Sequence, residues 1–454
     1  MKTMTYKKKY VSTTNACKLC RPMGAMLAFR GIEGAVPFLH GSQGCATYMR
    51  RYIISHFNEP IDIASSSLGE KNAIYGGGAN LKLGLANVIN KFHPSLIGIA
   101  TTCLTETIGD DVPMFLHQFK TEANGQPLPK LINISTPSYS GTHAEGFHGA
   151  VRAAVDSLAE AGDTSKSINL LPGFISPADT RYLQEIMADF GLAATILPDI
   201  SDTLDGQALR KYEMIPAGGT KISEIKEMGA AKATIEFGRT MVDELSAGML
   251  LNERFKTPFT RLGAPMGLRE TDRLFAELET LSGQPTPEKY SKERGRYIDG
   301  CVDGHKYLSG KRAIVYGEED FVVGLASFLA EIGIKPVLCA SGGKSKKLAG
   351  AINAVTNDIL AEPPIVREGM DFFEIAEEAE ALAPDLLIGH SKGYSLAKKL
   401  NIPIIRVGFP IHDRMGGQRI LHLGYRGAQM LFDQIVNRII EHKQDSSSVG
   451  YSYM

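Results

Sequence analysis

The chain has 454 residues, of which 43% are hydrophobic, so it can bury a large core and divide into two to four domains. Its 49 Lys and Arg residues balance 50 Asp and Glu residues, which excludes a general electrostatic attraction to nucleic acid or to anionic membranes. Neither a membrane span nor a secretory signal is predicted, and the six unevenly spaced cysteines do not form a secreted disulfide framework. We therefore expect a cytoplasmic protein with reduced thiols.

Short apolar stretches alternate with helical stretches along the whole chain. In chain order, strands are predicted at 35–40, 96–100, 131–135, 168–173, 194–197, 234–237, 311–317, 335–339, 386–389 and 404–407. Helices are predicted at 24–29, 46–57, 80–92, from 146 onward, and at 177–190, 222–228, 270–281, 292–307, 320–332, 372–381, 396–400 and 428–442. Such alternation predicts an α/β fold of mainly parallel sheets with helices on both faces. We expect three doubly wound domains, at 1–162, 163–308 and 309–454.

Three cysteines stand at places where chemistry is expected in an α/β fold. Cys45 ends the loop His40-Gly-Ser-Gln-Gly-Cys45 at the start of a helix, where the helix dipole favours a thiolate. Cys103 follows a buried strand at its carboxyl end, where open α/β sheets bind ligands. Cys20 precedes the first helix. Thiolates are the ligands that iron–sulfur clusters require.

The spacing of these cysteines matches no local ferredoxin pattern, so simple burial of free thiols is the alternative interpretation. Three thiols are an odd ligand set, and this indicates that a partner chain completes the site. Cys17 is interpreted as an accessory, structural thiol, because a zinc site would need a second Cys pair nearby. Cys301 and Cys339 are interpreted as core or helix-face residues.

Other candidate residues lie near the cysteine loops. His40, His56 and His143 are close to them in the sequence and are expected to line or tune the site. The turn after residue 317 follows a strand as a nucleotide-binding turn would, but it is acidic and lacks the glycine pattern, so nucleotide binding is rejected there.

These motifs resemble those of a known family, the β-type subunits of nitrogenase component 1. The residues that carry the resemblance are Cys20-Arg-Pro-Met-Gly-Ala25, His40-Gly-Ser-Gln-Gly-Cys45, His56-Phe-Asn-Glu-Pro60, Thr101-Thr-Cys103, Glu106-Thr-Ile-Gly-Asp-Asp111, Thr136-Pro-Ser138, Pro172-Gly-Phe174, Gly408-Phe-Pro-Ile-His-Asp-Arg414 and Gly424-Tyr-Arg-Gly427. The resemblance implies three α/β domains, an α2β2 heterotetramer and an iron–sulfur cluster shared with a homologous α-like subunit. It places the cluster ligands at Cys20, Cys45 and Cys103.

Two members of that family fit the residues. One is the NifN type, the β-like subunit of the scaffold on which the iron–molybdenum cofactor precursor matures, with a NifE-like partner that holds most of the precursor and a [4Fe-4S] cluster at the interface. The other is a catalytic β subunit of nitrogenase or a nitrogenase-like reductase, with a NifD-like partner and an [8Fe-7S] P-cluster. Either would take electrons from an ATP-dependent iron protein.

The two types differ at a few positions. The three retained cysteines favour the catalytic type. The scaffold type is favoured by the nineteen residues that precede Cys20, by the phrase Ile235-Glu-Phe-Gly238, and by Thr142 in place of a serine that can ligate the oxidised P-cluster. From the sequence we expect the scaffold type, with Thr142 as an accessory site residue.

Overall fold

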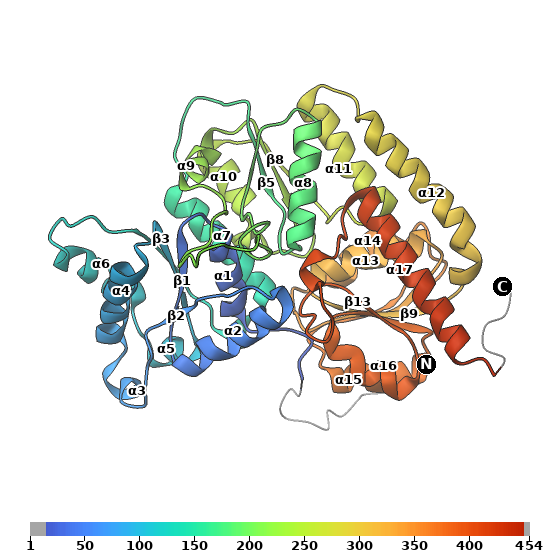
Figure 1. The fold of residues 1–454 in the computed structure, drawn as a ribbon, viewed down its shortest axis with the longest axis horizontal. Helices are drawn as coiled ribbons and strands as arrows, with labels where there is room; N and C mark the ends of the chain where they lie inside the picture. Colours follow the sequence, from blue (N-terminus) through green and yellow to red (C-terminus); the bar gives the residue numbers. More distant parts are fainter. Residues whose placement is uncertain (1–14, 449–454) are drawn as a thin grey trace.

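The computed structural model describes residues 15–448 and contains three parallel sheets, each layered between helices. Figure 1 shows the first sheet on the left, the second at the top and the third at the lower right. All strand pairs within the sheets are parallel, which confirms the predicted fold class. The domain limits expected at 162/163 and 308/309 stay a prediction. The basic stretch at 1–14 and the last six residues lie outside the described part of the chain.

The first sheet has the strand order β2-β1-β3-β4. Its strands are β1 (Ala35–His40), β2 (Ala64–Ser65), β3 (Leu96–Thr101) and β4 (Lys130–Ile134). Its helices are α1 (Arg21–Arg30), α2 (Gln43–Phe57), α3 (Asn72–Tyr75), α4 (Gly78–Phe92), α5 (Cys103–Ile108), α6 (Val112–Glu122) and α7 (His143–Leu158). Strands β1 and β3 are buried along their whole length, as their apolar sequences require.

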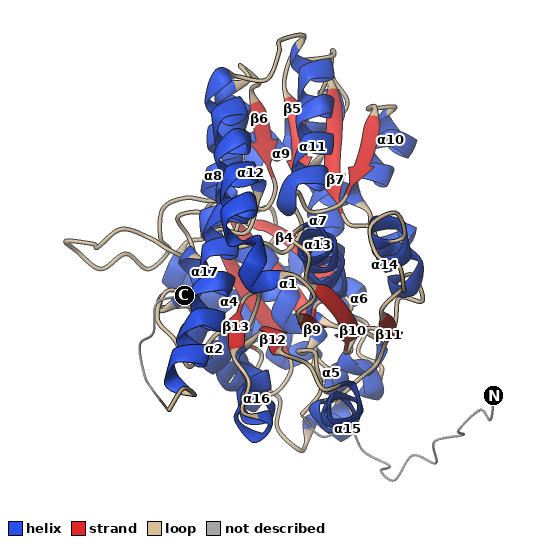
Figure 2. Cartoon of the chain, turned by 90° about the vertical axis from the view of Figure 1, so that its right-hand side faces the viewer, coloured by secondary structure: helices blue, strands red, loops and turns tan. Residues whose placement is uncertain are grey.

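The second sheet has the order β6-β5-β7-β8. Its strands are β5 (Ile168–Leu171), β6 (Ala194–Ile196), β7 (Ala233–Phe237) and β8 (Phe259–Leu262), and the helices of this part are α8 (Pro177–Asp189), α9 (Ile222–Glu227), α10 (Ala247–Phe255), α11 (Gly267–Ser282) and α12 (Glu288–Leu308). Figure 2 shows this sheet above the other strands.

The third sheet has the order β11-β10-β9-β12-β13. Its strands are β9 (Arg312–Gly317), β10 (Lys335–Ser341), β11 (Ile365–Arg367), β12 (Leu386–Gly389) and β13 (Ile404–Arg406), and its helices are α13 (Glu319–Glu331), α14 (Leu348–Thr356), α15 (Phe372–Leu382), α16 (Tyr394–Leu400) and α17 (Gly424–Asp445). Its order places β9 next to both β10 and β12, so the chain switches direction across the sheet at β9, as doubly wound sheets do.

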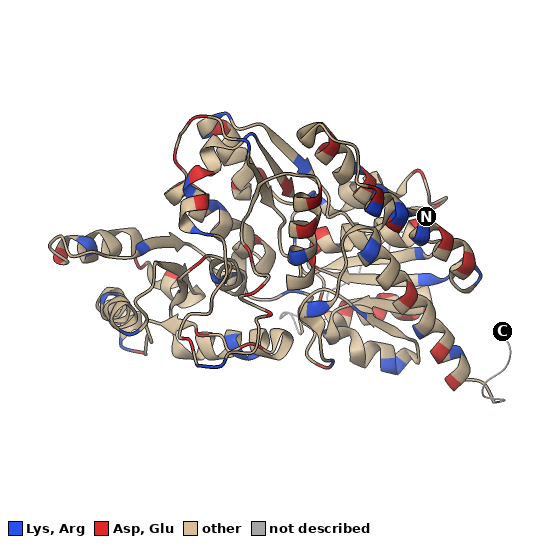
Figure 3. Ribbon diagram, turned by 45° about the horizontal axis from the view of Figure 1, so that its top comes forward, with Lys and Arg blue, Asp and Glu red and all other residues tan. Residues whose placement is uncertain are grey.

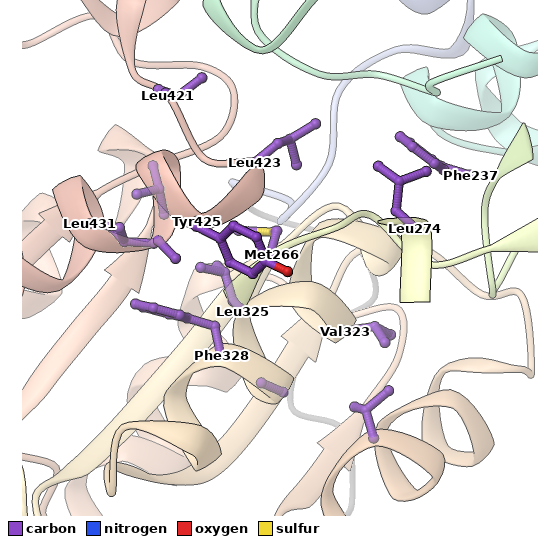
Figure 4. Packing of buried hydrophobic residues seen from close by; sticks show 14 of the residues in the cluster. Phe237, Met266, Leu274, Val323, Leu325, Phe328, Leu421, Leu423, Tyr425 and Leu431 are labelled. Atoms are coloured by element: carbon purple, nitrogen blue, oxygen red, sulfur yellow. The ribbon is translucent and has the colours of Figure 1, made fainter. Parts of the chain in front are cut away.

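One large hydrophobic cluster joins the second and third sheets. Met266, Leu274, Phe328 and Tyr425 pack together in it, from the segment before α11, from α11 itself, from α13 and from α17 (Figure 4). A separate cluster packs α1 and α7 against the first sheet. Acidic and basic residues are interspersed along the ribbon (Figure 3), in agreement with the near-zero net charge. Within residues 15–448, no helix is long and apolar enough to cross a membrane.

Candidate metal centre

Cys20 is held in place by a close contact between two helices. It immediately precedes α1. The backbone N–H of His143, at the start of α7, donates to the carbonyl of Leu19, the residue before Cys20, at 3.1 Å. A Cβ at Gly24 would lie 1.7 Å from the His143 carbonyl oxygen, and one at Gly146 would lie 1.8 Å from the Arg21 carbonyl oxygen. Only glycine lets α1 and α7 approach so closely, so Gly24 and Gly146 fix the start of α1 against α7.

Cys45 lies in the first turn of α2, one loop after β1. Ser42 precedes the helix, and its hydroxyl lies 3.5 Å from the Cys45 sulfur. The predicted start of this helix at 46 was three residues late, because the structure continues the helix back to Gln43. The loop glycine Gly41 packs against Thr102, where a Cβ would lie 2.2 Å from the threonine Cγ2.

Cys103 is the first residue of α5, directly after β3. Thr102 precedes the helix and forms a capping box with Thr105. The backbone N–H of Ser138, in the loop after β4, donates to the Cys103 sulfur at 3.2 Å. Because β1 and β3 are neighbours whose connections lead to opposite sides of the sheet, Cys45 and Cys103 lie at a topological switch point, where α/β sheets bind ligands.

Cys20 lies close enough to Cys45 and Cys103 to feel their charge. Burial raises the pKa of Cys20, and the negative charges of the Cys103 and Cys45 thiolates raise it further, while a hydrogen bond from Ser138 lowers it. All three cysteines are free and partly exposed. The structure therefore brings the three sequence-predicted thiols to one place. In the described range 15–448, no three His, Cys, Asp or Glu side chains converge closely enough to hold a single metal ion.

The donor set fits a polynuclear iron–sulfur cluster. Such a cluster is ligated by separate thiolates on different irons, so its ligands need not converge on one point. Each thiol lies beside a helix start, and Ser42 and Ser138 place hydrogen-bond donors next to the three sulfurs. Iron binds the thiolate form of cysteine, and hydrogen-bond donors and helix starts are the surroundings that suit a bound thiolate.

His40 supports the loop that carries Cys45. The side chain is fully buried at the end of β1, with Nδ1 2.9 Å from the Ser66 hydroxyl and Nε2 3.0 Å from an Asp110 carboxylate oxygen. Burial lowers the pKa of His40, and the charge of Asp110 opposes this effect. Asp110 also accepts the backbone N–H of Gly77 at 3.0 Å. Both ring nitrogens of His40 are thus engaged by the protein.

His56 and His143 lie in a pocket between the three sheets. This pocket is also lined by Phe174, His390 and Phe409, which follow β5, β12 and β13. Burial lowers the pKa of both His56 and His143 to about 3, so the rings are neutral at physiological pH. His56 Nδ1 accepts the backbone N–H of the residue after Pro410 at 2.9 Å, whereas neither ring nitrogen of His143 has a hydrogen-bond partner among the described residues.

Thr142 is the N-cap residue that immediately precedes α7. It forms a capping box in which the Glu145 carboxylate accepts the Thr142 backbone N–H, and it lines a second pocket together with Lys18 and Glu319. Its position at a helix start next to the segment that leads into Cys20 accounts for Thr142 in structural terms. Its role toward a metal remains a prediction.

The remaining cysteines lie in other parts of the molecule. Cys17 packs into the hydrophobic cluster of the third sheet, where its sulfur lies 3.8 Å from Nε2 of His390. Cys339 is buried on β10 and Cys301 is half-buried on α12. Burial raises the pKa of Cys17 and Cys339 to about 12 and that of Cys301 to about 11. These values indicate thiols that stay protonated.

Two residues near the cysteines were not predicted as site residues. Ser138 belongs to the motif Thr136-Pro-Ser138, but no sequence signal showed that its N–H would face Cys103. Lys392 lies between β12 and α16, and its ammonium group reaches the segment before Cys20. A sequence separation of more than 370 residues hid this contact.

Comparisons with known proteins agree over nearly the whole chain. Residues 20–440 match the family described as nitrogenase component 1 type oxidoreductase. The nitrogenase molybdenum-iron protein beta chain of Clostridium pasteurianum is 36% identical over 94% of this chain and 93% of its own length. The nitrogenase vanadium-iron protein beta chain of Trichormus variabilis is 33% identical over 97% of both chains. A solved structure titled "Nitrogenase Cp1 at pH 6.5" superposes with a TM-score of 0.95 at 33% identity, covering 99% of this chain and 98% of that chain. The chain therefore belongs to the nitrogenase component 1 family of oxidoreductases.

Proposed function

We propose that the chain is a β-type subunit that binds an iron–sulfur cluster at the interface with an α-type partner, and that the complex is a nitrogenase-type oxidoreductase. The observation that carries this proposal is the meeting of Cys20, Cys45 and Cys103 at the starts of three helices. The names of the relatives support the same assignment, since they are beta chains of molybdenum-iron and vanadium-iron nitrogenases.

The three thiolates would hold the group from one side. Cys45 and Cys103 lie beyond the carboxyl ends of the two central strands of the first sheet, and Cys20 lies near them, just before α1. When bound, an iron–sulfur cluster supplies one-electron transfer at a potential set by its ligands, hydrogen bonds and exposure. The N–H of Ser138 and the hydroxyl of Ser42 would help to set that potential, because donors directed at sulfur stabilise negative charge.

The partner would cover the exposed side of the thiols. Tyr48, on the same helix as Cys45, is 41% exposed, and Tyr139, next to Ser138, is 68% exposed, so two large aromatic side chains are exposed near the cysteines. Exposed aromatic residues of this kind are typical of protein interfaces. We propose an α2β2 heterotetramer in which a NifD-like subunit completes the ligand set and an ATP-dependent iron protein delivers electrons.

A scaffold subunit of the NifN type is the second candidate. It is supported by the phrase Ile235-Glu-Phe-Gly238 and by Thr142, the N-cap residue of α7. In that case the shared group would be a [4Fe-4S] cluster, and a NifE-like partner would hold most of the iron–molybdenum cofactor precursor.

An iron count separates these candidates. The complex is co-purified anaerobically with its α-type partner from cells that cannot make the partner's own cofactor. About eight irons per αβ pair, lost in Cys20→Ala, Cys45→Ala and Cys103→Ala, support the electron-transfer subunit. About four irons, with a reduced S = 1/2 signal lost in Cys45→Ala, support the scaffold. Cys301→Ala is the matched control and should keep all the iron, and an iron-free complex would contradict both candidates.

A further inference from the structure

The five residues before Cys20 connect the third sheet's part of the molecule to α7. This segment, Asn15–Leu19, is called the strap here. The backbone N–H of Cys17 donates to the Met370 carbonyl at 3.1 Å, and the Cys17 carbonyl accepts the N–H of Gly342 at 3.0 Å. A Cβ at Gly342 would lie 2.6 Å from the Cys17 carbonyl, so the two backbones are in direct contact. The strap thus joins the end of β10 to the start of α1.

Lys392 binds the strap through two backbone carbonyls. It lies in the short turn between β12 and α16, and its ammonium group donates to the carbonyl of Ala16 at 2.9 Å and to that of Lys18 at 3.3 Å. One charged donor therefore forms hydrogen bonds to the strap on both sides of Cys17. Hydrogen bonds from a charged group are stronger than those between neutral groups. Burial lowers the pKa of Lys392.

The other side of the strap is fastened to α7. The Lys18 ammonium group donates to the carbonyl of Gly141 at 3.2 Å, and the Leu19 carbonyl accepts the N–H of His143 at 3.1 Å. The strap is therefore held between the third sheet and α7, and Cys20 follows directly. Since only one residue separates the Lys392-bound carbonyl of Lys18 from Cys20, a displacement of the strap moves the thiol.

We propose that Lys392 is a positioning residue for Cys20: by binding two strap carbonyls it fixes the Cys20 thiol at the shared cluster and ties it to the third sheet. This inference rests on the proposed function. It adds a residue from the last quarter of the chain to a site whose three thiols all lie in the first quarter.

Hydrogen exchange of the strap tests the hold itself. Lys392→Met is compared with Lys398→Met, which alters an exposed lysine further along the same turn and helix, in the complex with the α-type partner. We expect the amides of Cys17 and Gly342 to exchange about 10-fold faster in Lys392→Met, because a charge-assisted hydrogen bond contributes about that factor. The control should exchange at the native rate. Unchanged exchange in Lys392→Met would overturn the proposal. If that variant does not assemble, the neutral donor variant Lys392→Gln replaces it, with a smaller increase expected.

Iron release tests the consequence for Cys20. The loaded complex is mixed with a ferrous chelator, and the rate of iron loss is followed by absorbance. Lys392→Met should lose iron several-fold faster than Lys398→Met. Faster exchange without faster iron release would refute the positioning role. A native complex without iron at these cysteines would refute the proposed function instead, while the exchange result would still report on the strap.

Discussion

Replacing Gly41 by alanine should separate the loops that carry Cys45 and Cys103. A Cβ at Gly41 would lie 2.2 Å from Cγ2 and 2.3 Å from Oγ1 of Thr102, whereas ordinary contact begins at 3.4 Å. Neither side can yield easily. The Gly41 N–H donates to the Ser66 hydroxyl at 2.9 Å, and the Thr102 N–H donates to the His40 carbonyl at 3.1 Å.

The expected cost follows from the overlap. Overpacking of this kind costs about 1–3 kcal/mol. Gly41→Ala should therefore lower the free energy of unfolding by about that amount, measured by denaturant titration of the co-purified complex. It should also lower the iron bound per αβ pair, because the Cys45 and Cys103 sulfurs are moved apart.

Gly44, in the first turn of α2 just after this loop, offers a matched control. A Cβ there would meet only the Ser42 hydroxyl, at 3.8 Å, and Gly44 lies within α2. Gly44→Ala should keep the iron and raise stability by up to about 1 kcal/mol, since alanine is the better helix former. Native stability and full iron in Gly41→Ala would refute the reasoning that this contact sets the distance between the two loops.

Three further predictions concern stability and thiol reactivity. His143 has a pKa of about 3 in the folded chain against 6.5 in the unfolded chain. The unfolded chain therefore binds the extra proton, and the free energy of unfolding falls as the pH drops from 6.5 toward 3. In urea titrations between pH 5 and 6.5, His143→Phe should reduce this pH dependence by about 1.4 kcal/mol per pH unit. Asp179 is buried and accepts two backbone N–H groups just before α17. Asp179→Ala should therefore lower the stability by about 3 kcal/mol, whereas Asp156→Ala, at an exposed ion pair, should lower it by less than about 1 kcal/mol. Equal losses of stability for the two variants in thermal unfolding would contradict this. Cys17 and Cys339, with pKa values of about 12, should resist iodoacetamide at pH 8 until the chain unfolds, as peptide mass spectrometry can show.

Continuous apolar strands were the most predictable part of the fold. The segment 35–40 was predicted and observed with the same limits, because a buried parallel strand is apolar along its whole length. The half-buried edge strand β8 was missed, since its Thr and Arg residues interrupt the apolar pattern. Helices α10 and α14 were also missed. They are short, and their glycine residues weaken the helical signal.

The candidate site was predictable where it depends on local structure. The placement of Cys45 and Cys103 at strand and helix ends followed from the apolar run before each of them. The contacts of Cys20 could not be predicted in the same way. They depend on α7 and on Lys392, which the fold brings from far along the chain. Nor did the sequence show that Cys17, three residues from Cys20, is buried in the core of the third sheet.

The most direct test of the central claim is X-ray diffraction from crystals of the anaerobically purified complex, with data collected on both sides of the iron absorption edge. The account predicts anomalous iron density bonded to the sulfurs of Cys20, Cys45 and Cys103, at the interface with the α-type partner. Iron bound elsewhere in the chain, or three thiols without iron beside a fully loaded partner, would contradict it.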